Sequence, residues 1–183
     1  MKVLALVLAF GIIVSAASAT ENAQQPKVAV TVTEKTHGLE LLLEVDKRRY
    51  KSSDDLKLQV MLRNPTNKSV YVFRTLDWGV SASLSLQVSD VSGKQIEPDF
   101  APDAQTYDSP DDKSAFVKLG PDHFLGASFP ASLKFLNLTR PGKYSISVEY
   151  TSPFSSAEVE LKPFLGRESG SLRSNVVSIE VVR

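Results

Sequence analysis

Apolar side chains recur at every second residue along most of this chain. The clearest run alternates apolar and mostly polar positions, and its apolar members are Leu56, Leu58, Val60 and Leu62. A period of two places alternate side chains on one face of a strand, so each such run predicts a strand with one buried face. Comparable runs occur at residues 28–33, 39–45, 84–88, 144–150 and 177–181. No window of eleven or more residues after residue 19 has a helical period, so the sequence predicts an all-β protein.

The predicted strands are short and are separated by turn-forming residues, as at Asn64–Lys68 and Val91–Lys94. About nine strands of this kind predict a single antiparallel, immunoglobulin-like β-sandwich over residues 27–183. The apolar pattern slips by one position at residues 133–138, which predicts a β-bulge there. The sequence contains no cysteine, so no disulfide can link the two sheets, and their contact must be apolar.

The first residues have the features of a secretory signal peptide. Lys2 gives a positive start, residues 3–14 carry no charge, and Ala17 and Ala19 form an A-x-A cleavage site. The apolar stretch is well short of the ~20 residues that a membrane-spanning helix needs. We therefore expect cleavage after Ala19, a flexible leader at residues 20–26, and an extracytoplasmic protein, periplasmic or secreted, with no membrane span after cleavage.

A turn at residues 139–143 precedes Tyr144, which opens an alternating strand. This resembles the tyrosine corner of immunoglobulin-like domains, in which the hydroxyl bonds back to upstream backbone. Ile146 stands where immunoglobulins carry a cysteine. The alternative is an ordinary hairpin turn before a strand that begins with an aromatic residue.

Two segments support a family resemblance. The strand–Asn–turn–strand sequence of residues 55–70, and the closing strand of residues 174–181, resemble bacterial extracytoplasmic immunoglobulin-like domains. Among named families the chain is similar to the domain of the BsuPI-type intracellular proteinase inhibitors. The resemblance implies protease inhibition or protein binding, although the founding member of that family is intracellular and this chain carries an export signal. No residue-level role carries over from it.

Composition argues against several functions. Lys and Arg total 21, Asp and Glu total 21, and the pI is near 6.7, which disfavours a nucleic-acid-binding protein. The absence of cysteine excludes a thiolate zinc site and a Cys nucleophile, and the two histidines, His37 and His123, stand apart among turn residues. We therefore assign no catalytic residue, no metal ligand and no cofactor.

Two charged segments and one aromatic residue leave weaker signals. The acidic segment Glu97–Asp112 predicts an exposed loop; its spacing does not match a calcium-binding loop, and whether it binds calcium stays open. The basic residues of 47–51 are flanked by acids, which favours a solvated strand edge over an anionic partner. Trp78, the only tryptophan, is predicted at the core or its edge.

The long connection before the last strand, residues 151–173, is the candidate binding loop. It contains an apolar tip beside an arginine, and the residues proposed for contact are Phe154, Phe164, Leu165 and Arg167. The alternative is that the apolar side chains fold back over the end of the core, because apolar loop residues usually pack. Alternate apolar residues at 157–161 predict an extra strand pair within the connection.

These observations favour an exported, non-catalytic binding module whose partner is another protein. The alternative is a proteinase inhibitor of the BsuPI type, which needs no catalytic residue of its own. A hydrolase or a metal-dependent enzyme is the least favoured reading, because the residues for such chemistry are scarce. Neither the partner nor the oligomeric state follows from the sequence.

Overall fold

A computed structural model describes residues 38–78, 83–99 and 109–183. The predicted signal peptide, the leader and the strand at residues 28–33 lie outside these ranges, as does His37. The described residues form strands β1 to β11 and two short 3₁₀ helices, so the protein is all-β, as the alternation predicts. No helix within these ranges is long and apolar enough to cross a membrane.

One sheet contains three strands in the order β1-β3-β8, all antiparallel. The strands are β1 (Glu40–Val45), β3 (Asp55–Arg63) and β8 (Phe124–Ser132). Burial along β3 alternates strictly at its apolar positions, from Leu56 to Leu62, which confirms the strand predicted there. β8 pairs with β3 over its whole length and is an edge strand of this sheet.

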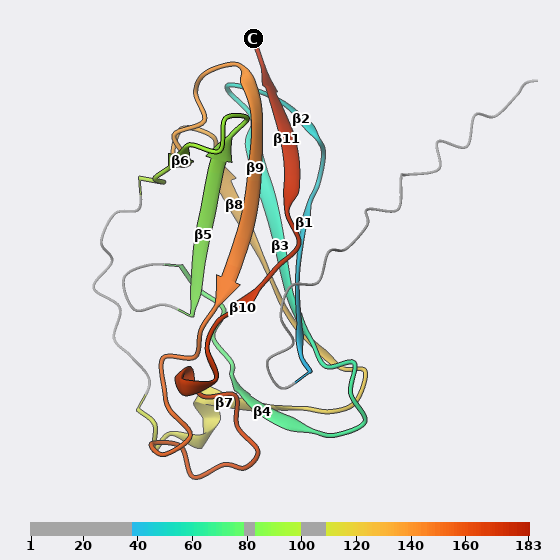
Figure 1. The fold of residues 1–183 in the computed structure, drawn as a ribbon, viewed down its shortest axis with the longest axis vertical. Coiled ribbons are helices and arrows are strands. Elements are labelled where there is room, and N and C mark those ends of the chain that lie inside the picture. Colours follow the sequence, from blue (N-terminus) through green and yellow to red (C-terminus); the bar gives the residue numbers. More distant parts are fainter. Residues whose placement is uncertain (1–37, 79–82, 100–108) are drawn as a thin grey trace, which may run out of the picture.

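The second sheet has the order β2-β11-β9-β5-β6. Its strands are β2 (Arg49–Lys51), β11 (Val177–Val182), β9 (Gly142–Tyr150), β5 (Leu84–Asp90) and β6 (Gln95–Ile96), and β10 (Leu172–Arg173) also pairs with β9. The pairing is antiparallel except between β2 and β11, which run parallel. β2 lies in the basic run and forms an edge, as predicted for that run. The two sheets lie in two layers (Figure 1).

Inward side chains of the two layers form one apolar core, which holds the sheets together without a disulfide. A smaller core lies under the third sheet, made of β4 (Val70–Phe73) and β7 (Phe116–Leu119). This second core is called the aromatic cluster below, and its buried members are Phe73, Ala115, Phe116, Phe154, Val159 and Phe164. The 3₁₀ helices are η1 (Lys113–Ala115) and η2 (Arg167–Ser169).

Two of the predicted local structures are wrong. Residues 133–137 form a turn after β8 and not a bulged strand: the Leu136 N–H donates to the Ser132 carbonyl at 3.2 Å, and Asn137 has a positive φ of 56°. The irregular apolar spacing arises because this turn buries Leu133, Leu136 and Leu138 completely. Residues 157–161 also form no strand, because Val159 is buried in the aromatic cluster from a turn.

A buried amide organises the turn after β3. Asn64 Nδ2 donates to the carbonyls of Lys68, Leu119 and Gly120 at 2.7, 2.9 and 3.1 Å. Its Oδ1 accepts hydrogen bonds from the N–H and the hydroxyl of Thr66, at 3.1 and 2.6 Å. Asn64 therefore joins the 64–68 turn to the end of β7.

A second buried side-chain amide, that of Asn175, bonds to β1, which lies 132 positions away in sequence. Asn175 Oδ1 accepts from the Leu43 N–H at 2.9 Å, and Asn175 Nδ2 donates to the Leu43 carbonyl at 2.9 Å. The side-chain amide thus takes the place of a neighbouring strand on the outer edge of β1. We call this pair of hydrogen bonds the Asn175 clamp.

Tyr144 makes the hydrogen bond that the tyrosine-corner interpretation expects. Its hydroxyl donates to the Arg140 carbonyl at 2.7 Å, across the turn that leads into β9, and its ring is buried. The bond fixes the entry of β9 into the second sheet.

Replacing Tyr144 by phenylalanine is expected to lower the free energy of unfolding by about 0.5–1.5 kcal/mol, because one hydrogen bond is lost while the ring stays packed. Urea unfolding of the variant measures this change. Replacing Tyr144 by leucine removes the ring as well and should have a larger effect. Equal stability of the phenylalanine variant and the unmodified protein would show that the bond does not stabilise the turn.

Candidate functional site

The structure brings three of the predicted contact residues into the core. Phe154, Phe164 and Leu165 are 9%, 4% and 2% exposed, so their side chains are not available to a partner in this conformation. The loop is tied to β4, where the Tyr71 N–H donates to the Pro163 carbonyl and the Leu165 N–H donates to the Tyr71 carbonyl. The connection therefore covers the end of the core, as the packing alternative expects.

Edge-to-face aromatic contacts explain why the loop folds back. The ring of Phe164 lies 5.4 Å from that of Phe116, and the ring of Phe154 lies 5.5 Å from that of Phe73. Such pairs stabilise packing beyond the area that they bury. The aromatic partners come from β4 and β7, which are far from the loop in sequence, so the pattern of the loop alone does not reveal them.

Arg167 is the one predicted contact residue that stays exposed. Its Nη2 bonds to Glu158 Oε2 at 2.8 Å, and its Nη1 donates to the Pro153 carbonyl at 3.2 Å. The N–H and hydroxyl of Ser155 also donate to Glu158, and these bonds, with the Arg167 charge, hold the pKa of that carboxyl below its ordinary value. Arg167 thus closes the loop on itself at the surface.

Two other expectations from the sequence concern metal binding and the charged loop. No group of three or more His, Cys, Asp or Glu lies close enough within these ranges to hold a metal ion. His123 is exposed in the turn between β7 and β8. Of the acidic segment, residues 100–108 lie outside the described ranges, and its described residues are irregular backbone. Every buried side-chain nitrogen and oxygen in the described part of the chain has a hydrogen-bond partner.

An apolar pocket lies where β8 of the first sheet faces β5 of the second. Its volume is about 170 Å³, close to the ~150 Å³ of an apolar cavity that accepts a benzene ring. No charged side chain lines it; the lining residues are Leu58, Trp78, Leu86, Phe129, Pro130, Ala131, Phe135 and Leu136. We call this site the Trp78 pocket.

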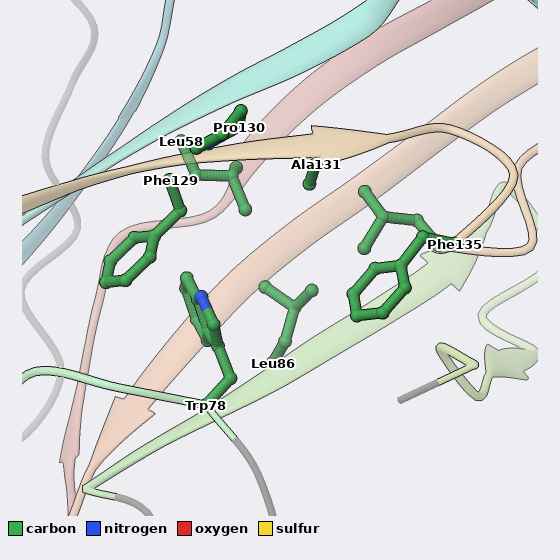
Figure 2. A pocket seen from close by; sticks show the side chains of 8 residues that line it. Leu58, Trp78, Leu86, Phe129, Pro130, Ala131 and Phe135 are labelled. Atoms are coloured by element: carbon green, nitrogen blue, oxygen red, sulfur yellow. The ribbon is translucent and has the colours of Figure 1, made fainter. Parts of the chain in front are cut away.

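The Trp78 pocket is built by strand alternation and by the turn after β8. Figure 2 shows the rings of Trp78 and Phe129 next to each other, with Leu86 reaching in from β5. The two ring centroids are 4.4 Å apart at an interplanar angle of 64°. The backbone of Trp78 makes two contacts that fix its position. Its N–H donates to the Asp77 carboxylate at 2.7 Å, and it forms an isolated β-bridge with Leu84 at the start of β5. The sequence predicts Trp78 at the core or its edge but does not indicate its pairing with Phe129.

Comparisons with known proteins identify no family. No protein-family model matches the chain, and no curated protein sequence matches it. Among solved structures, a β-glucosidase from Erythrobacter marinus aligns over 79% of this chain at 13% identity and a TM-score of 0.37. A β-glucosidase from Listeria innocua, solved with glucose and with isofagomine, aligns at 11% and 14% identity, over 80% and 79% of this chain, with a TM-score of 0.35 in both cases. The chain spans only 15% of the first of these structures and 16% of the other two, and similarity this low carries no functional meaning.

Proposed function

We propose that this chain is an exported, non-catalytic protein-binding module with an immunoglobulin-like sandwich fold, and that the Trp78 pocket receives an apolar side chain of its partner. The observation that carries the proposal is the pocket itself: a ring-sized, uncharged site at the side of the two layers. The side chains that contribute most to protein interfaces are often aromatic and lie in well-packed, desolvated pockets.

The strand order supports the immunoglobulin-like part of the proposal. In such domains the first, second and fifth strands share one sheet, and the third, sixth and seventh strands share the other. Here β1, β3 and β8 share one sheet, while β5, β9 and β11 share the other, in the same chain order. The hydroxyl bond of Tyr144 at the start of β9 is where a tyrosine corner belongs.

Export is supported by the sequence of residues 1–19, and a non-catalytic role by the composition, which provides no cysteine and only two histidines. The partner is therefore sought among extracytoplasmic proteins.

The experiment compares capture of extracytoplasmic proteins by three forms of the purified protein: unmodified, Phe135→Ala and Val91→Ala. Phe135 lines the pocket, whereas Val91 is 81% exposed in the β5–β6 turn and serves as the control for loss of a surface apolar side chain. We expect a partner that is retained by the unmodified protein and by Val91→Ala, and that is lost with Phe135→Ala. Titrating that partner should shift the fluorescence of Trp78, which is the only tryptophan.

Equal capture by all three forms would contradict binding at the Trp78 pocket. A panel of proteases tests the alternative function: stoichiometric inhibition, with the protein left undigested, would favour a proteinase inhibitor of the BsuPI type.

A further inference from the structure

The outer edges of the two main sheets differ in how they are protected against pairing with another strand. The β2 edge carries the charges of Arg49 and Lys51, and β6 is only two residues long. The β1 edge is bonded by the Asn175 clamp. Charge, shortness and covering groups all discourage edge-to-edge association. β8 is nine residues long and has no charged side chain, so it has none of these protections.

The hydrogen bonds of β3 show which backbone groups of β8 point outward. The Lys57 N–H and carbonyl both bond to Asp46, on the β1 side of β3. The Asn64 N–H donates to the His123 carbonyl, on the β8 side. Because the direction alternates along a strand, even-numbered residues of β3 bond to odd-numbered residues of β8. The backbone groups of Phe124, Gly126 and Ser128 therefore point away from the sheet.

These outward groups have no partner in the described part of the chain, where no hydrogen bond reaches the N–H or the carbonyl of Phe124, Gly126 or Ser128. These three residues are also exposed, and the exposed fraction of Phe124 is 65%. Pro130 is the next residue in this outward series, and it has no N–H to donate. Three outward residues therefore offer both an N–H donor and a carbonyl acceptor, and Pro130, the next in the series, offers only an acceptor.

We propose that β8 pairs antiparallel with β8 of a second copy of this chain, about a two-fold axis at Gly126. In this register Gly126 lies opposite Gly126 of the second copy, and Phe124 lies opposite Ser128, so each of these outward residues exchanges both of its hydrogen bonds. Shifting the register by two residues would place Pro130 opposite Phe124 and lose donors. The uncharged strand creates no like-charge repulsion with its own copy. The two three-stranded sheets become one continuous sheet, independently of what binds the Trp78 pocket.

The test uses opposite charges at the two-fold axis. A Cβ at Gly126 makes only ordinary contacts, with its nearest neighbours at 3.5 Å, and no positive φ restricts this glycine, so a side chain fits without disturbing the fold. Gly126→Lys and Gly126→Glu each place like charges opposite one another, and each should raise the dimer dissociation constant at least tenfold in sedimentation velocity. Gly126→Ser, a neutral control, should remain dimeric. An equimolar mixture of the Lys and Glu variants should form a heterodimer.

Hydrogen exchange checks the same geometry. In the unmodified protein the amides of Gly126 and Ser128 should become protected as concentration rises, whereas the Ala127 amide, which faces β3, should be protected at every concentration. The proposal is overturned if the protein is monomeric at millimolar concentration. A monomer would also be the result if another segment of the same chain paired with the outer edge of β8. It is also overturned if the dimer survives both charged variants, or if the mixture does not associate.

Discussion

Replacing Phe164 by alanine is expected to lower the free energy of unfolding by about 3–5 kcal/mol, the usual effect of removing a buried phenylalanine. Phe164 is 4% exposed and packs edge-to-face on Phe116, so its removal leaves a cavity in the aromatic cluster. In a chain of this length the melting temperature should fall by roughly 10 °C. Thermal and urea unfolding measure both quantities.

Arg167→Ala is the matched control from the same loop. Its ion pair with Glu158 is more than 40% exposed on both sides, and such pairs contribute roughly 0–1 kcal/mol. The two variants therefore separate packing from recognition. If Phe164→Ala left stability unchanged but abolished partner binding, the loop would be a contact surface. The burial of Phe164 in the aromatic cluster would then not be its main role.

Replacing Asn64 by alanine should lower the free energy of unfolding by about 2–4 kcal/mol. The variant leaves the carbonyls of Leu119 and Gly120 without the amide that bonds them, and buried polar groups without partners are costly. Asn67, an exposed asparagine in the same turn, is the matched control, and Asn67→Ala should change stability by less than about 0.5 kcal/mol. Similar losses for the two variants would mean that the Asn64 network does not hold the turn to β7.

The strands with one buried face were predictable because burial alone dictates a period of two. β3 and β9 alternate in sequence and in burial at the same positions, and the turn before β6 has the glycine with positive φ that it needs. The turn at residues 133–137 was mistaken for a bulged strand because three leucines of a buried turn also break the period. Short edge strands such as β2 have too few residues to show a period, and the parallel pairing of β2 with β11 has no local signature.

The candidate sites depended on contacts between distant residues, which the sequence does not display. Phe154 and Phe164 were recognised as apolar residues of a long connection, but whether they contact a partner or the core depends on Phe73 and Phe116. Trp78 and Phe129 meet only because β8 of one sheet faces β5 of the other. The outward groups of Gly126 and Ser128 become recognisable only when the strand order shows that β8 is an edge.

The Asn175 clamp has a consequence for the order in which the molecule can fold. Its two residues are separated by 132 positions in sequence, and β2 pairs only with β11, the last strand. Closing so long a loop loses chain entropy before any contact is gained, and folds dominated by such distant pairings form slowly. β2 and the outer edge of β1 therefore cannot make their final contacts until Asn175 and β11 have been synthesised. β1 can pair with β3 before that point, so these two contacts are late steps that complete the edges of the two sheets.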